Sequence, residues 1–228
     1  MISMRYAILL AFLVTSNAET LDQILRRMDV ESASFKGATA KMKRIDYDGT
    51  IKTTVEEAGT MTFLRKKGSV LALLEFTDPD KKTYAFHDRE LQEYLPKLNL
   101  VNIYDAGKYS KLANELISLG FGSSGKELEK TYEIKWIGSE TIKTADTEVK
   151  TTKLELVPRS AEGRKRWNKI EFWIPETKAY AVQLKIYQDH GNTDTAIYSN
   201  VQINPPTLSE KSVELKLPKD AKKDYINR

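Results

Sequence analysis

The stretch AYAVQLKIYQ, residues 179–188, is the clearest indication of how this chain folds. Its apolar residues occupy alternate positions, with the polar residues Gln183 and Lys185 between them. The same period of two occurs in residues 148–157 and 166–174. Successive side chains of a strand point to opposite faces, so the repeated pattern predicts a wide antiparallel sheet with one apolar face. The alternating apolar residues are Leu154, Leu156, Ile170, Phe172, Ile174, Tyr180, Val182, Leu184 and Ile186.

The first eighteen residues have the pattern of a secretory signal peptide. Arg5 precedes the uninterrupted apolar run 7–14, and Ser16-Asn17-Ala18 has the small-x-small pattern of a cleavage site. We therefore expect export and cleavage after Ala18. An uncleaved membrane anchor is the less favoured alternative, because a span needs roughly 20 apolar residues. No later run is long and apolar enough to cross a bilayer, so the sequence predicts a soluble mature part, residues 19–228.

The composition restricts how the mature part is stabilised and what it binds. The chain has no cysteine, which argues against disulfide bonds and against a lipid anchor on cysteine. Residues 19–228 are long enough for one large β domain or two small ones, and no linker or repeat divides them, which favours a single domain. The net charge of +4 falls to +3 without Arg5, which is too small for a nucleic-acid-binding surface.

Helices are predicted at few places. Thr20 and Gln23 have the capping-box pattern, and the apolar residues that follow them have helical spacing. A second helix is expected at 109–119, ended by Gly120, and a short third at 126–130. Further strands are expected at 35–47, 59–66, 69–76, 83–87, 91–95, 131–137, 195–203 and 213–217.

Two or three short helices and no second sheet are available to cover the apolar face. Either the sheet folds on itself, or the helices cover a concave surface that is only partly filled. Concave apolar surfaces of this kind bind apolar ligands. We expect the cavity to be lined by Phe63, Leu71, Leu73, Tyr84, Phe86, Tyr94, Ile134, Trp136, Leu154, Leu156, Ile170, Phe172, Val182, Leu184, Ile186, Ile197 and Val201.

No pattern of catalytic or metal-binding residues stands out. Residues 120–126, GFGSSGK, match G-x-G-x-x-G in letters, but that motif needs a preceding strand within a βαβ unit, and here a helix is predicted before it. The two histidines, His87 and His190, lie beside aspartates at predicted turns and match no ligand spacing. No G-x-S-x-G nucleophile motif is present. We therefore expect no metal, no cofactor and no enzymatic activity.

The order of the predicted elements resembles the LolA-type periplasmic carriers of outer-membrane lipoproteins. The signal peptide and N-terminal helix are followed by a strand that opens at Ser32-Ala33-Ser34-Phe35. Residues 59–65 (GTMTFLR), 76–79 (FTDP), 84–89 (YAFHDR) and 91–96 (LQEYLP) are similar to the family's early strands and hairpin. Residues 172–174 (FWI), 198–201 (YSNV) and 215–218 (LKLP) are similar to its late strands. The resemblance extends over nearly the whole mature chain.

The resemblance implies an unclosed antiparallel half-barrel whose concave face is covered by helices, with acyl chains bound beneath them. It also implies that Arg65 bonds to this cover and latches it, although Lys66 and Lys67 stand where the family usually has proline. We therefore expect a monomeric periplasmic carrier. It would take acylated lipoproteins or lipids from an inner-membrane donor protein to an outer-membrane acceptor protein.

Two other functions remain open at this point. One is an interaction module of the same fold that senses lipids or lipoproteins in envelope-stress signalling. The other is an envelope hydrolase, for which the sequence offers no set of catalytic residues.

Overall fold

The strands of this chain form a single sheet in the computed structural model, which describes residues 19–67, 69–87, 89–105, 107, 119–145 and 147–226. The predicted signal peptide, residues 1–18, and residues 109–118 of the predicted second helix lie outside the described residues. The strands are β1 (Gly37–Asp48), β2 (Thr53–Lys66), β3 (Ser69–Asp78), β4 (Lys82–His87), β5 (Glu90–Leu95), β6 (Leu100–Asp105), β7 (Tyr132–Lys143), β8 (Glu148–Pro158), β9 (Lys169–Pro175), β10 (Gln183–Tyr187), β11 (Thr193–Ile203) and β12 (Lys222–Ile226). The helices are α1 (Leu21–Ser34), α3 (Gly125–Thr131), α4 (Ala161–Arg164) and the short 3₁₀ turns η1 (Pro96–Leu98), η2 (Asp189–Gly191) and η3 (Glu210–Val213).

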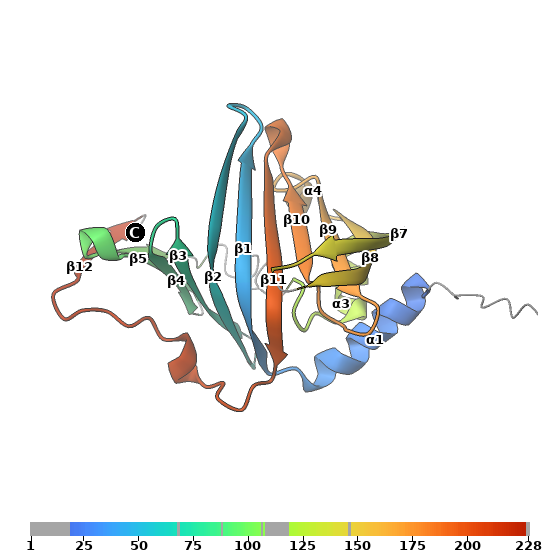
Figure 1. Ribbon diagram of the computed structural model, residues 1–228, viewed down its shortest axis with the longest axis horizontal. Helices are drawn as coiled ribbons and strands as arrows, with labels where there is room; N and C mark the ends of the chain where they lie inside the picture. Colours follow the sequence, from blue (N-terminus) through green and yellow to red (C-terminus); the bar gives the residue numbers. More distant parts are fainter. Residues whose placement is uncertain are drawn as a thin grey trace, which may run out of the picture.

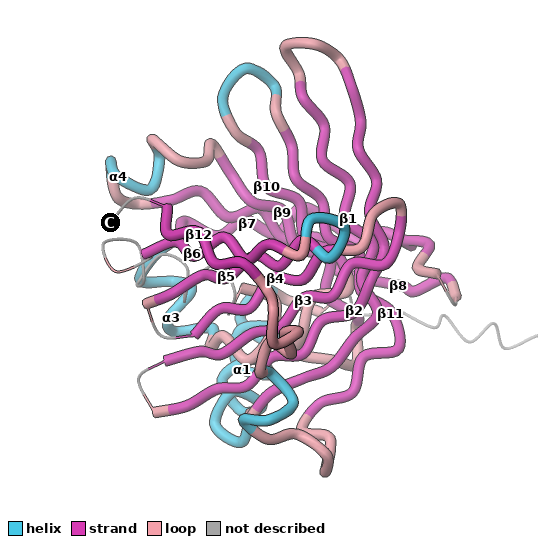
Figure 2. The backbone as a smooth tube through the Cα atoms, turned by 90° about the vertical axis from the view of Figure 1, so that its left-hand side faces the viewer, coloured by secondary structure: helices cyan, strands magenta, loops and turns pink. Residues whose placement is uncertain are grey.

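The sheet has 12 strands in the order β12-β6-β5-β4-β3-β2-β1-β11-β10-β9-β8-β7. Only β12 and β6 pair in parallel; the other neighbours are antiparallel. β12 and β7 are the edges, and no pairing among the described residues joins them. Figure 1 shows β1, β2, β10 and β11 upright in the centre, with the remaining strands on either side, and Figure 2 shows the strands side by side. This confirms the predicted fold class, a mainly β, unclosed antiparallel half-barrel with a few helices.

Helix α1 begins where the sequence predicts it. The Gln23 N–H donates to Thr20 Oγ1 over 3.3 Å, and the Thr20 N–H donates to Gln23 Oε1 over 2.9 Å, which completes the capping box. Ile24, Leu25 and Met28 are buried against the apolar face of the sheet. We call this the concave face and the opposite one the outer face. α1 therefore covers part of the concave face, and the Lys126 N–H of α3 reaches it by donating to Asp29 Oδ1 over 3.1 Å.

The C-terminal segment differs from the prediction. The predicted strand at 213–217 is irregular after η3, and its Val213 is buried on the outer face against Leu71 and Leu73. Strands β6 and β12 were not predicted. The strand β12 reads KKDYI and is mostly exposed at the edge of the sheet, so it lacks the alternation by which a half-buried strand is recognised.

Candidate functional site

A cavity of about 240 Å³ lies on the concave face, between β1, β2, β3, β10 and β11. The strand register explains why its residues meet, because directly opposed residues of an antiparallel pair share a face. Met42 lies opposite Tyr198, and Ala196 lies opposite both Arg44 and Leu184. Only two of the lining residues carry a charge, so the wall is suited to an apolar ligand. The lining residues are Met42, Arg44, Met61, Ala72, Leu74, Leu184, Ile186, Asp194, Ala196 and Tyr198.

The concave face is filled by its own side chains next to α1. Phe63 and Phe172 are fully buried there, and the ring centroids of Phe35 and Phe63 lie 5.6 Å apart. Phe121 packs edge-on against Tyr198 at 4.9 Å between centroids. Dispersion contacts of this kind make the packed end rigid. Among the described residues, the cavity is therefore the part of the half-barrel that side chains leave unfilled beside this packed end.

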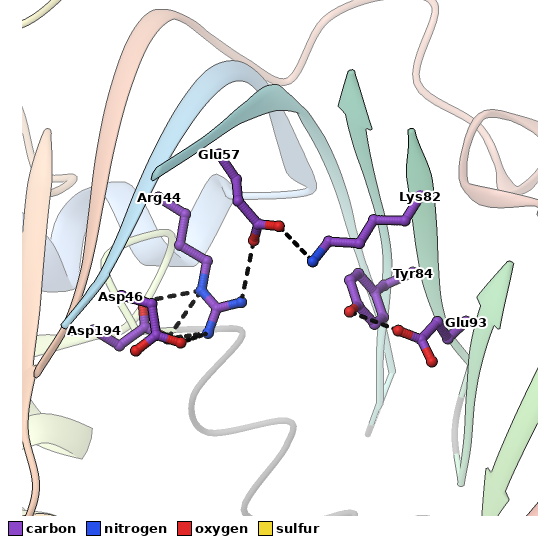
Figure 3. Close-up of polar contacts among 7 residues, drawn as sticks. All are labelled: Arg44, Asp46, Glu57, Lys82, Tyr84, Glu93 and Asp194. Carbon is purple, nitrogen blue, oxygen red and sulfur yellow. Dashed lines mark hydrogen bonds and ion pairs between the residues drawn. The ribbon is translucent and has the colours of Figure 1, made fainter. Parts of the chain in front are cut away.

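A polar network crosses the concave face on the far side of the cavity from α1 (Figure 3). The Nε of Arg44 donates to both carboxylate oxygens of Asp194 over 3.1 Å, and its Nη2 donates to Asp194 Oδ2 over 2.8 Å. The guanidinium also lies 3.4 Å from Asp46 Oδ2 and 3.5 Å from Glu57 Oε2. Burial disfavours the charge of Arg44, but the bond to Asp194 and the surrounding carboxylates outweigh it and raise the pKa. Arg44 therefore stays charged at the cavity wall.

The network continues onto β4, β5 and β6. Lys82 is ion-paired with Glu57, and the Tyr84 hydroxyl donates to Glu93 Oε1 over 2.8 Å. The other oxygen, Glu93 Oε2, accepts two hydrogen bonds, from the Asn102 side-chain amide over 2.9 Å and from the Tyr104 hydroxyl over 3.3 Å. Burial raises the pKa of Glu93, but these three hydrogen bonds and the charge of Lys82 outweigh it, so the pKa lies below its ordinary value of 4.5. The polar groups of the network thus bond to one another without a ligand, and the network forms the boundary of the apolar surface on the side of the cavity away from α1.

The lowered pKa of Glu93 makes stability depend on pH. The unfolded chain takes up this proton more readily than the folded one, so the stabilisation is present above about pH 4.5 and is lost as the pH falls through the folded pKa. We expect Glu93→Gln to lower the free energy of unfolding at pH 7 by about 1 kcal/mol. The difference from the wild type should shrink below pH 4.5. Urea denaturation at several pH values measures this. The exposed outer-face variant Glu75→Gln is the control, and a deficit of Glu93→Gln that persists at low pH would contradict the assignment.

Arg65 joins the end of α1 to the segment before α3. Its Nη1 donates to the Ser32 carbonyl over 3.2 Å, and its Nη2 donates to the Gly122 carbonyl. The guanidinium also lies 5.1 Å from the centroid of the Phe35 ring. Gly122 has φ +72°, and a Cβ there would lie 2.2 Å from Phe35, so only glycine fits. We call α1 together with residues 119–124 the cover.

The structure brings many of the predicted cavity residues to the concave face. Leu184 and Ile186 line the cavity itself. Leu184 also belongs to the packed cluster with α1, and Ile186 borders it. Phe63, Leu154, Leu156, Ile170 and Phe172 fill this cluster without lining the cavity, and Tyr84, Ile134 and Val201 border it. Phe86 is buried opposite Ala72 on this face. Trp136 lies opposite Leu154 on the edge strand and is 42% exposed.

Five predicted cavity residues lie elsewhere, and for them the prediction is wrong. Leu71 and Leu73 lie on the outer face, where Val213 covers them. β3 is therefore apolar on both faces, because one face packs in the concave cluster and the other packs against Val213. Tyr94 also lies on the outer face, opposite Thr83 and Val101. Ile197 lies on the same face, opposite Lys43 and Gln183. Val182 precedes the regular part of β10 and packs with Trp173 and Ile142. The alternation in residues 179–188 therefore does not extend back to Val182.

Several lining residues were not predicted. Every second residue of β1 points to the concave face. Along the strand these side chains change from small to large and apolar and then to charged: Ala38, Ala40, Met42, Arg44 and Asp46. That order is readable in the sequence, and it indicates where the cavity ends. The partners that complete the lining, Met61, Ala196, Tyr198 and Asp194, come from pairings across the sheet.

No protein-family model matches the sequence, and no curated protein matches it. Among solved structures, an uncharacterised conserved protein from Thermus thermophilus has a TM-score of 0.53 at 13% identity, over 90% of this chain and 98% of that chain. MucB has a TM-score of 0.51 at 12% identity, over 86% of this chain and 62% of MucB. MucB of Pseudomonas aeruginosa has also been solved in complex with MucA.

A LolA superfamily protein, NE2245 from Nitrosomonas europaea, aligns at 12% identity and a TM-score of 0.39, over 87% of this chain and 99% of that chain. The likenesses to the Thermus thermophilus protein and to MucB show, at these identities, a shared fold alone. The open sheet of 12 strands and its helical cover agree with the unclosed half-barrel that the sequence predicts.

Proposed function

We propose that this protein is a carrier that binds an acyl chain of a lipid or lipoprotein in the concave cavity and moves it toward the outer membrane without catalysis. The observation that carries the proposal is the cavity of about 240 Å³ with its largely apolar lining on an open half-barrel. Each methylene transferred from water into such a site contributes about 0.8 kcal/mol. Burial of part of one chain therefore offsets much of the cost of leaving a membrane.

The size of the cavity implies that binding involves movement. Sites for drug-sized ligands enclose about 300–1,000 Å³, so the cavity as observed accepts part of one chain. A ligand with several acyl chains needs the cover to move away from the sheet. The contacts of Arg65 with Ser32 and Gly122 hold the cover closed, which gives this arginine the role of a latch in the proposal.

We expect Arg65→Leu to accelerate both uptake and release of a ligand. Two hydrogen bonds are lost, each worth about 1 kcal/mol, so both rates should rise about thirtyfold while the Kd changes less than about threefold. Stopped-flow fluorescence with a pyrene-labelled monoacylglycerol measures both rates. Lys66→Leu is the matched control, since this exposed neighbour forms, among the described residues, an ion pair with Glu210 alone, over 2.8 Å. Unchanged rates in Arg65→Leu would remove the latch from the proposal.

We place the carrier in the periplasm. The signal-peptide pattern of residues 1–18 supports this location. Within the part of the chain that the structure describes, no helix has the length and apolar character to cross a membrane.

Transfer between membranes tests the proposal. Donor vesicles that carry a pyrene-labelled monoacylglycerol should lose it to unlabelled acceptor vesicles faster when the protein is added. Depletion of the protein in cells should leave lipoproteins at the inner membrane. Absence of accelerated transfer would contradict the carrier function.

The second candidate is an interaction module of the same fold that binds lipid or lipoprotein and reports it to a protein partner. The observation that favours it is the fold shared with MucB, which has been solved in complex with MucA. Such a module binds the probe in the same cavity but does not speed its transfer between vesicles. The transfer assay therefore separates the two functions.

A further inference from the structure

A larger cavity, of about 630 Å³, lies on the outer face of the sheet. Strands β1, β2 and β11 form its floor, and the turn between β7 and β8 forms its roof. Figure 1 shows the β7–β8 hairpin reaching toward β11. The described lining residues are Lys41, Met42, Lys43, Ala58, Gly59, Thr60, Thr77, Lys143, Thr144, Ala145, Ile197 and Ser199.

The register shows that this outer cavity is separate from the concave one. Lys41 lies opposite Thr60 and Ser199, and these side chains form one row across the floor. Lys43 lies opposite Ala58 and Ile197 in the next row. Met42, between the two lysines, points its side chain to the concave face beside Tyr198. Side chains of successive residues thus line two cavities on opposite sides of one sheet.

The hairpin that forms the roof is fixed in place. Ile142 packs with Trp173 and Val182 in a small cluster on the outer face. The Trp173 Nε1 donates to Glu140 Oε2 over 2.8 Å. Within the turn, the Thr144 hydroxyl donates to the Thr147 carbonyl over 2.9 Å, and Thr144 is buried. The outer cavity is therefore built by tertiary contacts rather than by a free loop.

The described lining residues of the outer cavity carry charge of one sign. Three of the described lining residues are lysines, and none is acidic. Lys43 is paired with Glu56 over 2.7 Å, whereas Lys41 and Lys143 are exposed and have no ion pair among the described residues. Hydroxyls of Thr60 and Ser199 add hydrogen-bond donors, while Ile197, Ala58 and Ala145 provide apolar surface beside them. Ammonium groups next to an apolar floor match a ligand with an anionic head and an apolar body.

We infer that the outer cavity binds a single anionic amphiphile, whose phosphate or carboxylate lies at Lys41 and Lys143 and whose apolar part lies on Ile197 and Ala58. Its volume falls within the range of about 300–1,000 Å³ typical of small-molecule sites. This site is independent of the concave cavity and of the proposed carrier function.

Monomeric dodecyl phosphate, kept below its critical micelle concentration, tests the inference. Titration into isotopically labelled protein, followed by NMR, should shift the amide signals of Thr60, Ile197 and Ser199. The double variant Lys41→Glu/Lys143→Glu should weaken this binding at least about tenfold, since each reversal replaces an attraction by a repulsion near the surface. Lys219→Glu/Lys223→Glu changes two exposed lysines outside the cavity and should bind as the wild type does. The shifts should persist in Ala196→Trp, which fills only the concave cavity.

Three comparisons identify the ligand chemistry. Dodecyl maltoside, which has the same chain and a neutral head, should not shift these signals; equal binding would overturn the role of the lysines. Inorganic phosphate should bind much more weakly than dodecyl phosphate, and equal affinity would overturn the role of the apolar floor. Binding to phosphatidylglycerol vesicles without any binding of monomeric dodecyl phosphate would mean that the face docks on a membrane, which would overturn the proposed single-molecule site.

Discussion

Ala196→Trp is expected to abolish binding of an uncharged acyl probe while the protein remains folded. Ala196 is half-buried and lines the concave cavity opposite Arg44 and Leu184, so an indole there occupies the space that an acyl chain would use. Excluding only four methylenes costs about 3 kcal/mol, which is about a hundredfold in Kd. Fluorescence titration with a pyrene-labelled monoacylglycerol measures the loss.

The matched control places the same residue on the opposite face. Thr60 is exposed on β2 and belongs to the outer cavity, so Thr60→Trp should leave the Kd of the uncharged probe unchanged. Circular dichroism should give both variants the folded spectrum of the wild type. If Ala196→Trp bound the probe with the wild-type Kd, the acyl chain would not lie in this cavity.

Phe172→Ala is expected to cause the largest loss of stability among the predicted cavity residues. Phe172 is fully buried, lies between Leu154 and Leu184 in the register, and belongs to the cluster that packs against α1. Truncation of such a phenylalanine costs about 3–5 kcal/mol, because the apolar contacts are lost and a void is left. Urea denaturation at neutral pH, with an unchanged m-value, measures this change.

Trp136→Ala provides the comparison, since this aromatic residue shares the concave face but stands on the edge strand β7 with 42% of its surface exposed. Its removal should cost less than about 1 kcal/mol. Equal losses in the two variants would show that the packed end and the open edge of the half-barrel are not energetically distinct.

The fold class was readable from the sequence because two local signals are strong. The Thr20 and Gln23 capping box marks the start of α1, and alternation of apolar residues marks the strands β8, β9 and part of β10. Both signals depend on neighbours a few residues apart, which a sequence displays directly.

The lining of the cavity was harder to predict because it depends on which face of each strand is covered by another part of the chain. Leu71 and Leu73 looked equivalent to Phe63, but residues near the C-terminus cover them on the outer face. The polar network around Arg44 joins β1, β2 and β11, and only the pairing of distant strands brings these residues together. Alternation shows that a strand has two faces, but it does not say what lies over each.

Lipid analysis of the purified protein tests the carrier proposal most directly. Wild-type protein isolated from its native cells under mild conditions should release acyl lipid into an organic extract, detected by mass spectrometry at close to one equivalent. Ala196→Trp, prepared in parallel, should release far less. The account is contradicted if wild-type protein yields no acyl lipid and also fails to bind the pyrene-labelled monoacylglycerol.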